Sequence, residues 1–149
     1  MQSRTFRTRS EEETVELGRS LAGELAGTVL LIGNLGAGKT TLAKGIVEGR
    51  GAARADEVSS PTFTLIHQYG GADGAAGYVY HVDLYRLDEP REVETLGLND
   101  LLASGQLVLI EWGERFPALL PDDRTEIRLR TLPDESREIT VSERWPGGE

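Results

Sequence analysis

A glycine-rich segment in the first third of the chain has the residue types and the spacing that bind a nucleotide phosphate. Residues 33–40 read GNLGAGKT and match the pattern G-x-x-x-x-G-K-[ST] at every fixed position. Successive backbone N–H groups of such a loop point inward at the phosphates, and glycine leaves room for that close approach. We expect Lys39 to reach the β- and γ-phosphate oxygens and the Thr40 hydroxyl to ligate magnesium. The nucleotide-contacting residues expected from this segment are Asn34, Leu35, Gly36, Ala37, Gly38, Lys39, Thr40 and Thr41.

A second segment offers a carboxylate for the same metal ion. Residues 107–110 are Leu-Val-Leu-Ile, and Glu111 follows them. An acid after an apolar run lies at the carboxyl end of a buried strand, which in a sheet of this kind is close to the phosphate loop. We therefore expect Glu111 beside Thr40 in the magnesium shell. Trp112 comes next, and either packing beside the site or ordinary core filling accounts for it.

Two further segments have polar residues that are candidates to act on the γ-phosphate. S-P-T-F at 60–63 lies where a loop leads into a strand, and such a segment often supplies a hydroxyl that senses the γ-phosphate. From this segment alone, a plain strand start is favoured over a sensing role for Thr62. In H-V-D-L-Y-R at 81–86, His81 and Asp83 lie on the same strand face. Asp83 is a candidate to bind the metal or to orient an attacking water. For His81, a packed and hydrogen-bonded imidazole is favoured over a catalyst.

The hydrophobic pattern predicts the elements that must position these residues. Ser10 and Glu13 have the spacing of a helix capping box, and leucines then recur every four residues. The continuous apolar segments 28–32 and 107–110 are typical of strands buried on both faces. The other expected elements are a helix over about 39–50, hairpins of 62–69 with 78–84 and of 125–131 with 137–141, and short helices over 88–102 broken at Gly97.

These elements predict an α/β protein. The expected fold class is a P-loop NTPase-like three-layer fold with a mixed, mainly parallel central sheet and an antiparallel C-terminal hairpin. We expect one P-loop domain over residues 1–145 and a disordered tail over 146–149.

The amino-acid composition argues against several classes of function. The 149 residues include 16 Lys and Arg against 25 Asp and Glu, a net charge of −9. This balance argues against binding nucleic acid unaided or an anionic membrane surface. The absence of cysteine excludes disulfides, thiolate catalysis and cysteine-ligated zinc. With no long apolar run and no signal-peptide core at the start, we expect a cytoplasmic protein without a membrane partner.

Five motifs, taken in order, resemble those of the bacterial TsaE (YjeE) family. They are GNLGAGKTT at 33–41, SPTF at 60–63, HVDLYRL at 81–87, LGL at 96–98 and IEW at 110–112. The resemblance runs from about residue 10 to about residue 141, and the combination is far more specific than any single motif. Members of this family are P-loop ATPases of the tRNA threonylcarbamoyladenosine (t6A) pathway, so the resemblance implies ATP and Mg²⁺ as cofactors.

The resemblance also implies a role for particular residues. The catalytic residues would be Lys39, Asp83 and Glu111, and the metal would be held by Thr40, Glu111 and Asp83. Thr62 would belong to a switch-like segment, and Trp112 would lie against the active site. Arg137 matches an arginine near the nucleotide on the last hairpin, and Glu11 lies where the first helix begins close to the base. Asn34 departs from the family, which more often has Asp at this position.

The function that the resemblance implies is a Mg-dependent ATPase subunit that resets a TsaB–TsaD-like assembly. Its hydrolysis would be weak alone and partner-dependent, and it would meet tRNA only indirectly through the complex, in agreement with its net charge of −9. Two alternatives stay open, a P-loop small-molecule kinase and a nucleotide-gated protein-binding switch. The arginines are scattered without a lid cluster, which disfavours the kinase, and no N-K-x-D element is present for guanine. The sequence leaves the oligomeric state open.

Overall fold

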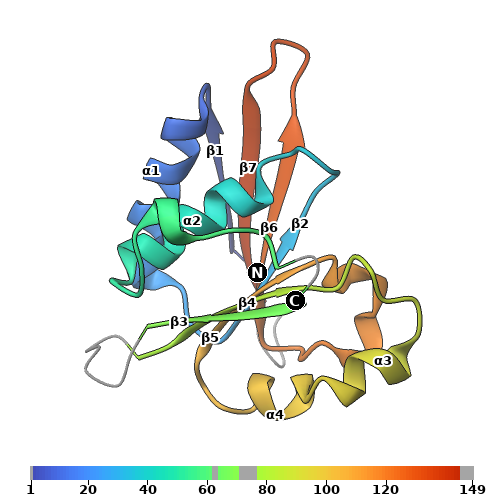
Figure 1. The fold of residues 1–149 in the computed structure, drawn as a ribbon. Helices are drawn as coiled ribbons and strands as arrows, with labels where there is room; N and C mark the ends of the chain where they lie inside the picture. The colour runs from blue at the N-terminus through green and yellow to red at the C-terminus, as the bar shows by residue number, and fades with distance from the viewer. Residues whose placement is uncertain (1, 62–63, 71–76, 145–149) are drawn as a thin grey trace.

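A seven-stranded sheet forms the middle of the molecule (Figure 1). The computed structural model describes residues 2–61, 64–70 and 77–144. The strands lie in the order β1-β7-β6-β2-β5-β4-β3. Their bounds are β1 (Gln2–Thr8), β2 (Thr28–Ile32), β3 (Ile66–Tyr69), β4 (Val79–Asp83), β5 (Leu107–Glu111), β6 (Arg124–Thr131) and β7 (Arg137–Arg144). The four central strands β6, β2, β5 and β4 run parallel, and the outer strands add antiparallel pairs at both edges.

This sheet confirms the expected fold class, with one strand that the sequence pattern did not predict. Strand β1 pairs antiparallel with β7 along its whole length, from Gln2 opposite Glu143 to Thr8 opposite Arg137. Phe6 is its one large apolar residue, so no hydrophobic alternation announces it. The strand forms because the edge of β7 offers backbone partners. It brings residues 8–10 to the same end of the sheet as the glycine-rich loop.

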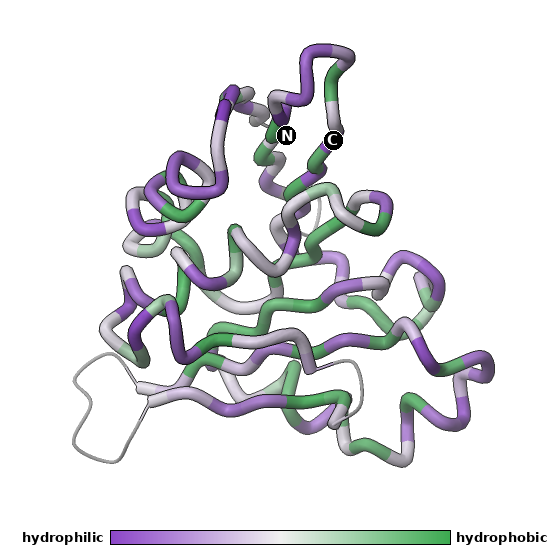
Figure 2. The backbone as a smooth tube through the Cα atoms, turned by 45° about the horizontal axis from the view of Figure 1, so that its top comes forward, coloured by the Kyte–Doolittle hydropathy of each residue, from purple (hydrophilic) through white to green (hydrophobic). Residues whose placement is uncertain are grey.

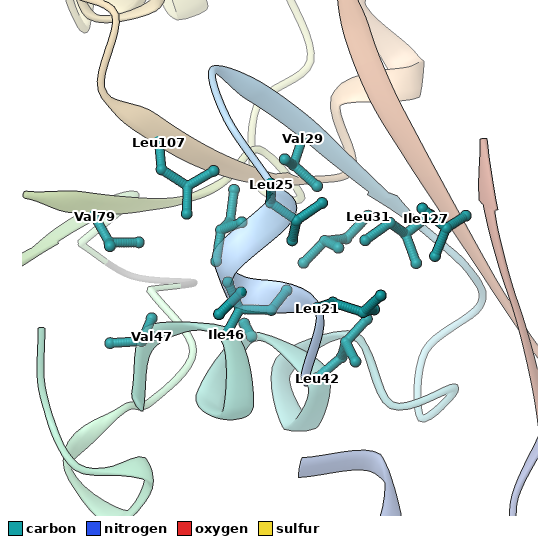
Figure 3. Packing of buried hydrophobic residues seen from close by; sticks show 14 of the residues in the cluster. Leu21, Leu25, Val29, Leu31, Leu42, Ile46, Val47, Val79, Leu107 and Ile127 are labelled. Carbon is teal, nitrogen blue, oxygen red and sulfur yellow. The ribbon is translucent and has the colours of Figure 1, made fainter. Parts of the chain in front are cut away.

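Helices cover both faces of the sheet and make it the middle of three layers (Figure 1). Helices α1 (Glu11–Leu21) and α2 (Lys39–Gly49) pack on one face, and α3 (Pro90–Thr95) and α4 (Leu98–Leu102) on the other. Alternate residues of β2 and β5 therefore enter two separate cores, with Leu31 and Leu109 in one and Leu30 and Ile110 in the other. Figure 3 shows the first of these cores, and Figure 2 shows hydrophobic stretches in the central strands with hydrophilic ones toward the periphery.

Helices α1 and α2 approach each other through glycines. A Cβ on Gly45 would lie 2.0 Å from the Val15 carbonyl oxygen, and one on Gly18 would lie 2.5 Å from the Leu42 carbonyl oxygen. Both positions therefore require glycine for the backbones to meet. The contact fixes α2, which begins at the glycine-rich loop, against α1. The amino ends of both helices then border the same cleft.

Local details refine several of the expected elements. Ser10 is the N-cap of α1 and accepts the Glu13 N–H at 3.1 Å, whereas the Glu13 carboxylate accepts the N–H of Arg9 rather than that of Ser10. The first hairpin forms, but β3 begins only at Ile66 because Leu65 has a left-handed backbone, with φ 71°. Its tip at 71–76 and the tail expected at 146–149 lie outside the described residues. Within the described ranges, no helix is long and apolar enough to span a membrane.

Candidate functional site

The glycine-rich loop lies between the end of β2 and the start of α2. Gly36 and Gly38 have φ of 80° and 106°, a left-handed backbone that side chains with a Cβ rarely adopt. Gly33 is required for another reason, since a Cβ there would lie 2.7 Å from the Leu129 carbonyl oxygen on β6. Gly38 is the N-cap of α2, and within the described part of the chain no side chain caps this helix. Its first N–H groups and its positive end are therefore available to an anion.

Lys39 is a buried cation next to this loop. Its side chain is only 4% exposed; Nζ donates to the Gly33 carbonyl oxygen at 2.6 Å and lies 3.5 Å from the centre of the Trp112 ring. Burial lowers the pKa of Lys39, and the negative charges of Glu111, Glu114 and Asp83 oppose that shift. Among the described residues, the ammonium thus has a carbonyl and an aromatic face as its direct partners. A phosphate oxygen would be a stronger one.

The hydroxyl of Thr40 and the carboxylate of Glu111 meet as predicted. Thr40 Oγ1 donates to Glu111 Oε2 at 3.0 Å. The parallel pairing of β2 with β5 places Glu111 opposite Leu31, one residue before the end of β2, so the carboxyl end of β5 lies beside the loop. Hydroxyl and carboxylate oxygens are hard donors of the kind that Mg²⁺ prefers, and Mg²⁺ bound with phosphates uses few protein ligands. The residues present therefore fit magnesium.

Asp83 lies beside Glu111 on the neighbouring strand. The two residues are opposite each other in the parallel pairing of β4 with β5, and both side chains are buried. Asp83 Oδ1 accepts the Tyr85 backbone N–H at 2.9 Å, and Oδ2 accepts the Ser60 hydroxyl at 3.2 Å. Ser60 is a partner that the sequence interpretation missed. Its position next to Pro61 in the SPTF motif was the available signal.

Trp112 packs beside the site. It follows β5 in a left-handed conformation, with φ 66° and ψ 17°, which is uncommon for a bulky residue. The Lys39 ammonium lies over the Trp112 ring, and the centres of the Trp112 and Tyr85 rings are 5.1 Å apart. Of the two explanations considered for Trp112, the structure therefore supports packing at the site over simple core filling.

Arg137 braces the glycine-rich loop. It begins β7, donates from Nε to the Ala37 carbonyl oxygen and from Nη2 to the Gly36 carbonyl oxygen, each at 3.2 Å. It also donates from Nη1 to the Glu135 carbonyl oxygen at 2.6 Å. Because carbonyls that face a cation leave the adjoining N–H groups to face elsewhere, this contact favours a loop whose amides are directed at an anion. Glu11, the first residue of α1, lines the cleft near this loop.

A cleft of about 400 Å³ brings these residues together. The expected residues that line it are Glu11, Leu35, Gly36, Gly38, Lys39, Thr40, Thr41, Asp83, Glu111, Trp112 and Arg137. Asn34 and Ala37 do not line it; Ala37 is buried and contributes its carbonyl to Arg137. Thr62 lies outside the described residues. The lining residues that the sequence interpretation missed are Thr8, Arg9, Ser10, Thr14, Ser60, Tyr85 and Glu135.

The glycine-rich loop between β2 and α2, in a sheet with a parallel centre, gives the chain a P-loop NTPase-like fold. The sequence model for "Threonylcarbamoyl adenosine biosynthesis protein TsaE" matches residues 8–139. The crystal structure of Bacillus subtilis YdiB superposes with a TM-score of 0.76 at 32% identity, covering 97% of this chain and 87% of that one.

Curated relatives agree with this match. The chain is 39% identical over 144 residues to the Bacillus subtilis tRNA threonylcarbamoyladenosine biosynthesis protein TsaE, covering 95% of this chain and 87% of that protein. It is 38% identical over 138 residues to the Treponema pallidum protein of the same name, covering 91% and 97%. The chain therefore belongs to the TsaE family, which is involved in t6A biosynthesis.

Proposed function

We propose that this protein is the Mg²⁺-dependent ATPase subunit of the bacterial machinery that makes N6-threonylcarbamoyladenosine at position 37 of tRNA. In this proposal it binds a TsaB–TsaD-like assembly and resets that assembly by hydrolysing ATP. The observation that carries the proposal is the meeting of Lys39, Thr40, Asp83 and Glu111 in one cleft, in a chain of the TsaE family.

Lys39 and the amino end of α2 are the groups that we assign to the phosphates. The Lys39 ammonium would exchange its hydrogen bond with the Gly33 carbonyl for one with a phosphate oxygen, which is charge-assisted and stronger. The Trp112 ring stays against the same ammonium and excludes water from it. The positive charges of Lys39 and of the amino end of α2 would therefore lie where the negatively charged phosphoryl group is transferred. The reaction needs no covalent intermediate.

Thr40 and Glu111 are the side chains that we assign to magnesium. Their hydrogen bond already brings the Thr40 hydroxyl and the Glu111 carboxylate together beside the loop. Magnesium bound there would neutralise charge on the β- and γ-phosphate oxygens. The protein's part is to fix the hydroxyl and the carboxylate before the metal arrives, which limits the reorganisation needed on binding.

Asp83 is the carboxylate that we assign to the attacking water. Hydrogen bonds from the Tyr85 backbone and the Ser60 hydroxyl fix its orientation at the end of β4. A carboxylate held in this way can accept a hydrogen bond from water and align it with the γ-phosphate. Because the Ser60 hydroxyl donates to Asp83, a change in the position of Ser60 would also change the orientation of Asp83.

The rim of the cleft supports a partner-dependent activity. Leu35 is 69% exposed and Tyr85 43% exposed, and both line the cleft, so a protein that covers it would bury them. Arg137 is engaged by loop carbonyls and acts as a brace. We therefore expect slow hydrolysis by the isolated protein and acceleration by a partner that completes the site.

The direct test is Mg²⁺-dependent ATP hydrolysis with and without a TsaB–TsaD-like assembly. We expect the assembly to stimulate the wild-type protein, and Glu111→Ala to abolish the stimulated rate. Glu94→Ala, which removes an exposed acid on α3, is the matched control and should behave as wild type. Full Mg²⁺-dependent hydrolysis by Glu111→Ala in the assembly would show that the metal is held elsewhere.

The same measurements separate the two alternatives. A burst of ADP that needs a small metabolite and no protein partner would indicate the kinase. Partner binding that depends on ATP and survives Asp83→Ala, with hydrolysis irrelevant to modification, would indicate a nucleotide-gated switch.

A further inference from the structure

His81 is a fully buried imidazole directly behind the metal-binding carboxylate. It lies on β4, two residues before Asp83, and is 0% exposed. Its Nε2 is 2.6 Å from Glu111 Oε2. The parallel pairing of β4 with β5 sets this contact, because His81 lies opposite Leu109 and Asp83 lies opposite Glu111. His81 thus shares a sheet face with both acids of the site.

The two carboxylate oxygens of Glu111 differ in their hydrogen-bond partners. Oε2 receives both the Thr40 hydroxyl at 3.0 Å and the His81 Nε2 at 2.6 Å. These donors come from α2 and β4, so they fix the carboxylate from two independent elements. Among the described residues Oε1 has no hydrogen-bond partner, and it is therefore the oxygen left to ligate a cation, together with the lone pairs of Thr40 Oγ1.

The surroundings of His81 also select its tautomer. Donation to a carboxylate oxygen requires the proton on Nε2. His81 Nδ1 is buried without a hydrogen-bond partner in the part of the chain that the structure describes. A proton on Nδ1 would leave a donor buried and unpaired and would turn the Nε2 lone pair toward the Glu111 carboxylate, so both nitrogens favour the same tautomer.

We propose that His81 is a positioning residue of the magnesium site. Its Nε2–H holds the Glu111 carboxylate in the orientation that ligates the metal next to Thr40. Hydrogen-bond partners of metal ligands typically change metal affinity by 10- to 100-fold when they are removed. This inference rests on the proposed function, because the metal to be held is the one that accompanies the nucleotide.

The test is the binding of Mn²⁺, as a spectroscopic substitute for Mg²⁺, to the full chain saturated with ADP, followed by electron paramagnetic resonance. We expect His81→Leu to weaken Mn²⁺ binding by about 10- to 100-fold. His81→Gln, which retains a donor, should recover part of the affinity. His67→Gln is the matched control: His67 lies opposite His81 on β3 and contacts Tyr69 rather than Glu111, so Mn²⁺ binding should not change.

Two further measurements distinguish this role from a purely structural one. ADP affinity without metal should be the same for His81→Leu and the wild type, because only the carboxylate orientation has changed. In the metal-free wild-type protein, nitrogen NMR of its two histidines should show His81 with its proton on Nε2. A lone pair on Nε2, with the only ring proton on Nδ1, would overturn the proposal even if His81→Leu failed to fold.

The outcomes for metal binding separate the two proposals. Normal Mn²⁺·ADP binding by both the wild type and His81→Leu would overturn the role of His81 and leave the proposed function standing. Failure of the wild-type protein to bind Mn²⁺ with ADP would overturn the proposed function, and the role of His81 with it.

Discussion

At the residue scale, the positive charge of the candidate site (Lys39) and the negative charge of Glu111 lie on different elements and have separate contacts. Lys39 contacts a carbonyl and an aromatic ring, whereas Glu111 is bonded to Thr40 and His81. Burial lowers the pKa of Lys39 and the neighbouring acids oppose the shift. The site therefore holds a positive and a negative group close together without a direct ion pair, which leaves both for a phosphate and its metal.

Replacing Lys39 by methionine removes one charge and tests the assignment of Lys39 to the phosphates. Lys39→Met keeps an unbranched apolar side chain at this buried position and removes the ammonium, so the fold should be retained. A hydrogen bond to a charged group contributes about 1.5–3 kcal/mol, so ATP binding should weaken by about 10- to 100-fold. Isothermal titration calorimetry measures this, with Lys44→Met on the same helix as the control. Equal ATP affinity of Lys39→Met and the wild type would contradict the role of Lys39.

The residues that carry a motif and the meeting of Thr40 with Glu111 could be predicted from the sequence, whereas the hydrogen bonds made by Ser60 and His81 could not. Lys39, Thr40 and Glu111 stand out because the chemistry requires those types after an apolar strand. The bonds of Ser60 to Asp83 and of His81 to Glu111 depend on which strands are neighbours and in which register. No local pattern encodes that register, so a structure was needed to find them.

At the element scale, the position of the site depends on two contacts between elements. Helix α2 packs on α1 through Gly18 and Gly45, and β1 pairs with β7 and contacts the turn between β6 and β7 through Arg7. In that turn, Asp134 accepts hydrogen bonds from Ser136 and from the Arg7 guanidinium. The strand–loop–helix unit could be predicted because its apolar run and glycines are local, whereas β1 could not, since its partner β7 lies at the other end of the chain.

The close approach of α2 to α1 at Gly45 predicts that one added methyl group will lower the free energy of unfolding. In Gly45→Ala the new Cβ would lie 2.0 Å from the Val15 carbonyl oxygen, so α2 must move away from α1. Such overpacking should lower the free energy of unfolding by about 1–3 kcal/mol. Gly23→Ala is the control because a Cβ there meets nothing within 4 Å, and its effect should stay within about 0.5 kcal/mol. Urea unfolding measures both, and similar values for the two variants would be inconsistent with the close contact.

The turn predicts a pH-dependent stability. The Ser136 hydroxyl and backbone N–H, with the Arg7 guanidinium, lower the pKa of Asp134 from 3.8 to about 2. Because the folded pKa lies below the unfolded one, this contribution is present above about pH 4 and is lost as the pH falls toward 2. Asp134→Asn should therefore be less stable than the wild type at pH 6, with a difference that shrinks from pH 4 to pH 2. Melting temperatures across this range provide the measurement, and a difference independent of pH would contradict it.

At the scale of the whole molecule, the charge suits a subunit that works through other proteins. A net charge of −9 opposes direct binding of tRNA, and the exposed Leu35 and Tyr85 at the cleft offer apolar surface to a partner. The family places the chain in t6A biosynthesis. The proposal that reconciles these observations is an ATPase that acts on the assembly rather than on the tRNA.

The measurement that tests this proposal most directly is the number of t6A residues formed per TsaB–TsaD-like assembly. The assembly is supplied with tRNA, its threonylcarbamoyl donor, Mg²⁺ and ATP, with either the wild-type protein or Glu111→Ala. We predict many turnovers with the wild type and no more than about one per assembly with Glu111→Ala, because the assembly is then not reset. Equal multiple turnovers with the two proteins would contradict the account.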